Sequence, residues 1–89
     1  MVTGLRFGVT ALTDDLPSPA QVRAARALLA WSQNQLGKAS GTSRRTLVTF
    51  EAGGTVSIET ISAMKTAFEA NGIEFIREAD SEGVRRRGL

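Results

Sequence analysis

Apolar residues recur at helical spacing in two long segments of the chain. Residues 19–31 carry one such stripe, made of Val22, Ala25, Leu28 and Leu29. Residues 58–71 carry a second, made of Ile61, Met64, Ala67 and Phe68. Steps of three and four residues place each set on one face of a helix. Ser18 and Pro19 are typical of a helix start, and Asn71-Gly72 of a helix end. The pattern therefore predicts a first helix over about 19–31 and a last helix over about 58–71.

Two shorter helices are predicted between them. Ser32 is a suitable N-cap for a helix from Gln33 to about Ser40, and Gly41 can end it in the left-handed conformation. Ser43 then caps a helix over about 44–52, which the pair Gly53-Gly54 ends. Two short helices across such a turn form a helix-turn-helix, which places its second helix in the DNA major groove.

The residues of this unit divide between an inner and an outer face. Four of them can meet behind the turn: Leu36, Ala39, Leu47 and Phe50. Four residues of the second helix face away: Arg44, Arg45, Val48 and Thr49. Trp31, Phe50, Phe68 and Phe75 could stack on single-stranded bases, but their spacing among Leu and Ile favours core packing.

The two ends of the chain differ from the helical centre. Residues 1–17 are interpreted as an N-terminal arm, in which Leu5, Phe7 and Val9 alternate with polar or small residues as in a strand. Residues 73–77 are β-prone, 78–83 are polar, and 84–87 could return as a second strand. An isolated hairpin is only marginally stable, so it should pack on the helices, pair with the arm, or pair across a dimer axis. The expected divisions are 1–17 (arm), 18–72 (helix-turn-helix domain) and 73–89 (hairpin and basic tail).

Composition excludes several classes of function. The chain has 89 residues with no Cys and no His, which removes disulfides, thiolate sites and the commonest general base and metal ligand. No nucleophile–base pair or metal cluster is recognisable, so we expect neither an enzyme nor a cofactor. No apolar run approaches the ~20 residues of a membrane span, and the N-terminus lacks a signal-peptide profile. A small cytoplasmic binding module is therefore expected.

Charge is segregated along the chain, although the net charge is only +2. Residues 19–53 have a balance of +4, residues 54–82 of −4, and the last seven residues of +3. Such segregation suits one face that meets phosphate and another that stays in solvent. Chance sorting of ordinary surface charge would look the same, but the helix-turn-helix spacing favours the first interpretation.

Several motifs in order resemble the Cro/C1-type (XRE) helix-turn-helix regulators. Leu-Leu-Ala-Trp ends the first helix, and Ser32-Gln33-x-x-Leu36, Gly41-x-Ser43-x-x-Thr46-Leu47 and Glu51-x-Gly53 follow. The resemblance covers about 21–75 and extends to small bacterial members that continue with Gly-Ile-Glu-Phe-Ile and a terminal Gly-Val-Arg-x-Arg. It implies a mainly α, lambda-repressor-like bundle of about four helices with a short C-terminal β-hairpin or dimerisation strand.

The resemblance also implies roles for individual residues. Arg44, Arg45 and Thr49 match base-facing positions of the recognition helix, and one arginine could read guanine while the other takes a phosphate. Five residues match or neighbour phosphate-contacting positions: Gln33, Ser43, Thr46, Lys38 and Arg23. Alternatively, Gln33, Lys38 and Arg23 are solvated surface residues, and Ser43 serves as a cap.

Arg26 and Glu51 match a pair that often forms a salt bridge between the first and third helices of this fold. Arg26 would then be structural and only secondarily a phosphate ligand. The chain departs from the family where Gly37 replaces a usual alanine, at a cost of up to ~1 kcal/mol, and at Ser40 and Thr42. These departures predict a looser second helix.

The expected function is a sequence-specific, double-stranded-DNA-binding transcriptional regulator, a dimeric repressor of an inverted-repeat operator. Dimerisation would use the last helix and the C-terminal strands, where Ile73, Phe75 and Val84 offer apolar surface. The run Arg85–Arg87 would either reach flanking DNA or form a disordered solubilising tail. The alternative function is a protein-interaction module, an antitoxin or antiactivator, that uses the arm and the acidic segment 69–82.

Overall fold

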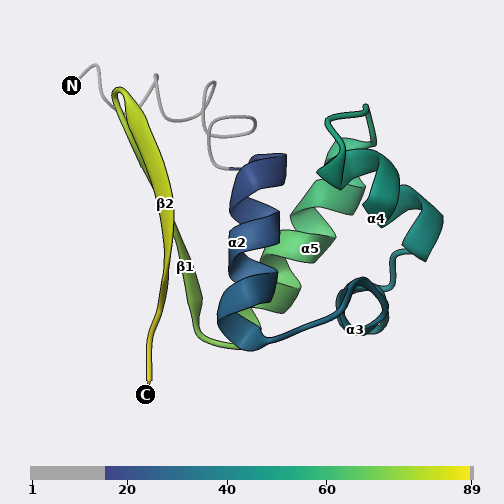
Figure 1. Ribbon diagram of the computed structural model, residues 1–89, viewed down its shortest axis with the longest axis horizontal. Coiled ribbons are helices and arrows are strands. Elements are labelled where there is room, and N and C mark those ends of the chain that lie inside the picture. Colours follow the sequence, from purple (N-terminus) through teal and green to yellow (C-terminus); the bar gives the residue numbers. More distant parts are fainter. Residues whose placement is uncertain (1–15, 89) are drawn as a thin grey trace.

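The computed structural model describes residues 16–88, which form four helices followed by an antiparallel hairpin (Figure 1). The helices are α2 (Pro19–Leu29), α3 (Gln33–Ser40), α4 (Arg44–Glu51) and α5 (Ile58–Ala70), and the strands are β1 (Ile73–Glu78) and β2 (Ser81–Arg86). The predicted mainly helical bundle with a C-terminal hairpin is thus confirmed. The strand pattern at Leu5, Phe7 and Val9, and the arm before residue 16, lie outside the described residues.

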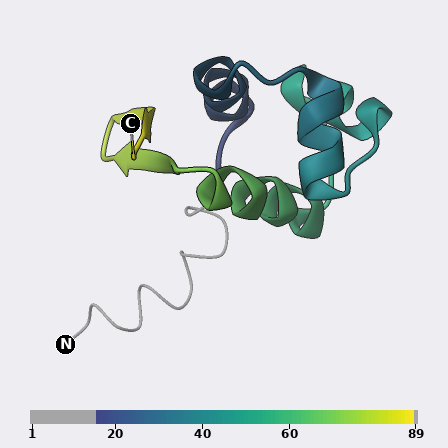
Figure 2. The same ribbon diagram turned by 90° about the horizontal axis from the view of Figure 1, so that it is seen from below.

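The central helices α2 and α5 separate the two ends of the molecule. Helices α3 and α4 lie on one side of them and the hairpin on the other, in two views at right angles (Figures 1 and 2). The hairpin contacts α2 through β2 and α5 through β1, whereas α4 contacts α3 and α2. The recognition helix predicted from the sequence therefore lies at the end of the molecule opposite to the hairpin.

A serine begins each of these four helices. The side-chain oxygens of Ser18, Ser32, Ser43 and Ser57 each accept a hydrogen bond from the backbone N–H three residues later. In α2 and α3 the residue at that position is Gln21 or Gln35, whose side chain bonds back to the serine N–H. These reciprocal capping boxes satisfy two backbone donors that a helix start leaves unpaired. The serine caps explain why α3 and α4 begin at the predicted residues.

Helix α2 ends two residues earlier than the predicted Trp31. Ala30 adopts a left-handed conformation with φ of 57°, and its N–H bonds to the carbonyls of the last helical turn. The chain then turns so that Trp31 stacks on Phe68, with ring centroids 5.6 Å apart. The left-handed conformation is unfavourable for alanine, so no local pattern around Ala30 predicts the early end of the helix.

The core joins all four helices to the first strand. Its fully buried large side chains are Val22, Leu36, Leu47, Met64, Phe68 and Ile73. The predicted core role of the aromatics is confirmed, because Phe50 is also buried and Trp31 and Phe75 pack against the same cluster. Two residues that were predicted to be buried are exposed. Leu28 is 40% exposed at the end of α2, and Ala39 is exposed because α3 turns Leu36, Gly37 and Ser40 inward instead.

Steric crowding at the turn after α3 explains why position 37 is a glycine where the family usually has alanine. A Cβ atom at this position would lie 2.7 Å from the carbonyl oxygen of Thr42, in the turn between α3 and α4. The Thr42 N–H in turn bonds to the Gly37 carbonyl at 3.0 Å. The glycine therefore lets the turn close tightly on α3, and the looser helix predicted from this departure is not what the contacts show.

We expect the substitution Gly37→Ala to destabilise the protein although alanine is the better helix former. The helix-propensity gain is about 1 kcal/mol, but the new methyl group must displace a backbone carbonyl, and overpacking typically costs about 1–3 kcal/mol. Urea unfolding should show a net loss. Asn34→Ala, an exposed change on the same helix, should leave the midpoint unchanged or higher. A Gly37→Ala variant as stable as the wild type would contradict this role.

The hairpin is longer and tighter than predicted. Its register pairs Ile73 with Arg86 at one end and Glu78 with Ser81 at the other, so the turn consists of residues 79–80 alone. The polar segment 78–83, expected to be a loop, instead contributes residues to both strands. Arg85 and Arg86 belong to β2, as the expected returning strand has them, so the alternative of a disordered tail does not apply to these two residues.

A buried glutamine fixes the hairpin to α2. The side-chain nitrogen of Gln21, a residue only 3% exposed, donates to the carbonyls of Ile76 at 3.0 Å and Gly83 at 2.9 Å. Arg77 donates to the Gln21 side-chain oxygen at 3.2 Å, and Arg86 donates to the Leu28 carbonyl at 3.1 Å. Of the three arrangements considered for the hairpin, packing on the helices is the one observed among the described residues.

Candidate nucleic-acid interface

Helix α4 is buried on one side and open on the other. Leu47, Phe50 and Glu51 point into the protein, whereas Arg44, Arg45, Val48 and Thr49 are exposed. Successive helical residues are rotated by about 100°, which places Arg45 almost opposite the centre of the buried side. The exposed side carries no acidic residue, because Glu51, the one acidic residue of α4, is buried.

The basic side chains of the described residues fall into two groups. Most arginines bond to protein groups: Arg23 and Arg26 to Glu51, Arg77 to Glu82, Arg85 and Arg87 to Glu74, and Arg86 to the Leu28 carbonyl. In contrast, the side chains of Lys38, Arg44 and Arg45 make no hydrogen bond or ion pair within residues 16–88. The three unpartnered cations all lie on α3 and α4.

The buried carboxylate of Glu51 links three helices beneath this surface. Arg26 donates to both of its oxygens, at 2.7 and 2.9 Å, and the Gln33 side-chain nitrogen donates at 3.1 Å. The Glu51 side chain is 6% exposed. Burial raises its pKa, but the hydrogen bonds from Arg26 and Gln33 and the charges of Arg26 and Arg23 outweigh burial, so the pKa is lowered overall. The structure thus contains the Arg26–Glu51 ion pair that the sequence predicted.

Two of the expected phosphate-contacting residues have partners within the protein. Gln33 uses one amide hydrogen for Glu51, and Arg23 donates to the Glu51 backbone carbonyl at the end of α4. Both side chains are thereby held beside the start of α3 and the end of α4. The sequence offered no signal for these bonds, which join residues far apart along the chain.

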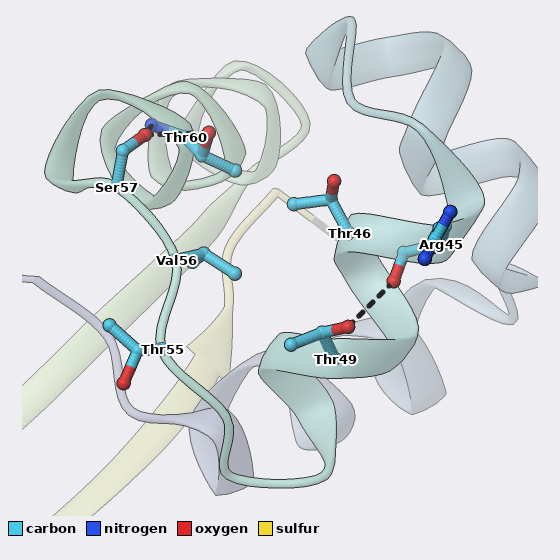
Figure 3. Close-up of a pocket in the computed structure, with 7 residues that line it drawn as sticks. All are labelled: Arg45, Thr46, Thr49, Thr55, Val56, Ser57 and Thr60. Carbon is cyan, nitrogen blue, oxygen red and sulfur yellow. Dashed lines mark hydrogen bonds between the residues drawn. The ribbon is translucent and has the colours of Figure 1, made fainter.

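The hydroxyl groups of α4 are also engaged. Ser43 accepts from the Thr46 N–H as the cap, and its hydroxyl donates to the Thr46 side-chain oxygen at 3.0 Å. The Thr49 hydroxyl donates to the Arg45 carbonyl at 3.0 Å, as the dashed line in Figure 3 shows. Thr49 therefore offers its methyl group and an accepting hydroxyl oxygen, rather than a free donor, to a ligand.

Two hollows flank the exposed side of α4. One, of about 390 Å³, separates Arg45, Thr46 and Thr49 from the chain that enters α5, and Figure 3 shows these residues on opposite walls. The α5 wall consists of Thr55, Val56, Ser57 and Thr60. The other, of about 400 Å³, includes Arg44 and Lys38 beside the turn between α3 and α4. Arg45 and Arg44 thus border different hollows, one on each flank of the exposed face of α4.

A family model described as helix-turn-helix matches residues 22–71, more than half of the chain. The chain belongs to the Cro/C1-type (XRE) helix-turn-helix family. This is a family of DNA-binding regulators. In its terms, α3, the turn at Gly41 and α4 are the helix-turn-helix, and the hairpin lies beyond the matched residues. No curated protein matches the chain.

One expectation about the dimer contact of this XRE protein needs correction. Ile73 was expected to offer apolar surface for dimerisation, but it is fully buried in the core. Phe75 and Val84 are half-buried against the same core. Alternate residues of a strand point to opposite faces of the sheet. Phe75 therefore faces inward like Ile73, whereas Ile76 lies on the outer face of the hairpin.

Metal-binding clusters and membrane spans are two further features to consider in residues 16–88 of this XRE protein. No group of three or more His, Cys, Asp or Glu side chains within that range could hold a metal ion. None of the helices described is both long enough and apolar enough to cross a membrane.

Proposed function

We propose that this chain is a sequence-specific, double-stranded-DNA-binding transcriptional regulator that inserts α4 into the major groove. The observation that carries the proposal is that Lys38, Arg44 and Arg45, whose side chains have no partner within residues 16–88, all lie on the helix-turn-helix. Cations left without protein partners favour a polyanionic ligand, whose phosphates supply most of the attraction. The exposed face of α4 carries no acidic residue, which suits the negatively charged groove.

The geometry supports different tasks for the two arginines. Arg45 faces directly outward, so we assign it to the N7 and O6 atoms of a guanine, with Thr49 one turn later against the neighbouring base. Arg44 lies beside Lys38 at the turn, and we assign both to phosphates. Ser43, Thr46, Gln33 and Arg23 lie at helix starts and flanks, where they would help to position the backbone of the DNA.

We further propose that the protein acts as a dimeric repressor on an inverted repeat. The hairpin and α4 lie at opposite ends of the longest axis (Figure 1), which measures 43 Å. Dimers joined through their hairpins would hold the two α4 helices at the outer ends. This arrangement favours half-sites separated by a multiple of the ~10 bp helical turn rather than by a single turn.

The outer face of the hairpin is the surface we propose for this contact. Ile76 lies there opposite Gly83 and next to the charged pair of Glu74 and Arg85. Sedimentation velocity should show a dimer at micromolar concentrations for the wild type and a folded monomer for Ile76→Glu, because burying the new charge is costly. Ile58→Glu, an equally drastic change at the exposed start of α5, should remain dimeric. A wild type that stays monomeric up to millimolar concentrations would reject the proposed contact.

Competition binding of genomic double-stranded fragments, including the DNA upstream of the protein's own gene, tests the main proposal. At physiological salt, a few fragments should compete at concentrations about 10³-fold lower than the rest, as specific sites do. Footprints on those fragments should form an inverted repeat. Weak binding that is equal for every fragment would contradict sequence-specific regulation and would favour the protein-interaction alternative.

A further inference from the structure

An apolar side chain lies in the middle of the basic face of α4. Val48 is 45% exposed, and the other large apolar residues of comparable exposure in residues 16–88, Leu28 and Ile58, lie on other helices. Valine is a weaker helix former than alanine because its branched side chain loses rotamer freedom. An exposed valine in α4 therefore contributes neither burial nor good helix propensity to the fold.

The neighbours of Val48 indicate what covers it. Residues three and four positions apart are adjacent on a helix surface, so Val48 lies against Arg45 and Arg44. Neither arginine side chain has a partner among the described residues. Charge complementarity therefore brings DNA onto this surface, and Val48 meets the edges of the base pairs that the arginines approach.

Only one apolar group of the major groove is available to the Val48 side chain. In the major groove the base edges present hydrogen-bond donors and acceptors, and the 5-methyl group of thymine is the exception. A valine beside two arginines cannot satisfy a polar edge, and placing it against one would leave donors or acceptors of the base unpaired. A thymine methyl is the partner that matches its chemistry.

We propose that Val48 determines specificity by contacting the 5-methyl group of a thymine adjacent to the guanine bound by Arg45. This inference rests on the proposed function, since it concerns the same helix in the same groove. It adds a residue to the reading surface that the family resemblance did not assign. The operator half-site should accordingly contain a thymine that the protein recognises through its methyl group.

The test begins with duplexes selected by the wild-type protein from a random double-stranded library. Each thymine of a selected duplex is then replaced singly by deoxyuridine, which removes only the methyl group. At one thymine per half-site the wild type should bind about fourfold more weakly, the effect expected from one buried methyl group. Val48→Ala should bind the thymine and uracil duplexes with equal affinity.

Leu28→Ala is the matched control, because it shortens a comparably exposed apolar side chain at the end of α2, where the backbone bonds to Arg86 of the hairpin. This variant should retain the wild-type preference for thymine. The assignment of Val48 would be overturned if the wild type bound thymine and uracil duplexes equally at every position, or if the preference for thymine persisted in Val48→Ala. Neither outcome would contradict the proposed sequence-specific DNA binding. Failure to enrich any sequence from the library would instead overturn sequence-specific binding, and the Val48 proposal with it.

Discussion

Replacing Glu51 by alanine is expected to lower the free energy of unfolding by about 3 kcal/mol. The variant leaves the half-buried guanidinium of Arg26 without its carboxylate and removes the acceptor of Gln33, and breaking a buried pair typically costs about 3–5 kcal/mol. Because Arg26 keeps some contact with solvent, the lower end of that range applies. Urea unfolding measures the loss.

Glu74→Ala is the matched control for this prediction. Glu74 pairs with Arg85 and Arg87, but all three side chains are exposed to solvent, and such surface pairs contribute about 0–1 kcal/mol. The control should therefore change the unfolding free energy by less than about 1 kcal/mol. Equal losses in the two variants would mean that the Glu51 cluster is not a structural link between the helices.

The same cluster predicts a pH dependence of stability. The pKa of Glu51 is lowered in the folded state, so its contribution is fully present above the unfolded pKa of about 4.3. It is lost as the pH falls through the folded pKa, because the unfolded state then binds the proton more readily. The stability difference between the wild type and Glu51→Gln should be constant near neutral pH and shrink in acid.

The double substitution Arg44→Ala and Arg45→Ala should weaken binding to a selected duplex by roughly a hundredfold. A good bidentate contact to guanine contributes about 1–3 kcal/mol of discrimination, and the second arginine adds a phosphate contact. Thermal stability should not fall, because neither side chain bonds within the described residues. Fluorescence anisotropy against the selected duplex, with circular dichroism for stability, makes the comparison.

A variant with the same loss of charge at the other end of the molecule is the control. Arg85→Ala with Arg87→Ala removes two arginines from the hairpin, where both pair with Glu74. Its affinity should stay within about threefold of the wild type, since exposed charges beyond the ~8 Å screening length act weakly. Comparable losses in the two double variants would show that overall charge, and not α4, governs binding.

Local signals in the sequence were sufficient to define most of the helices. Ser32, Gly41 and Ser43 sit at positions where only capping residues or glycine are favourable, and α3 and α4 begin where these residues predict. The errors arise where tertiary contacts outweigh local preference. Ala30 takes a left-handed conformation so that Trp31 reaches Phe68, a contact that no local pattern encodes.

The position of the candidate site could be predicted from the sequence, but the hydrogen bonds and ion pairs around it could not. Spacing placed Arg44 and Arg45 on the outer face of α4, where the structure has them. It could not reveal that Gln33 and Arg23 bond to Glu51, or that Gln21 holds the hairpin, because these partners are 18 to 62 residues apart. Charge counting likewise failed to separate paired arginines from unpaired ones.

Mapping the DNA contact by NMR tests the central claim most directly. Isotope-labelled protein is titrated with a selected duplex, and changes in backbone amide and arginine Nε–H signals are followed residue by residue. If α4 binds in the groove, the largest changes should fall over residues 33–52, including the side-chain signals of Arg44 and Arg45, with little change on the hairpin. Large changes confined to residues 73–86, with α4 unaffected, would contradict this claim.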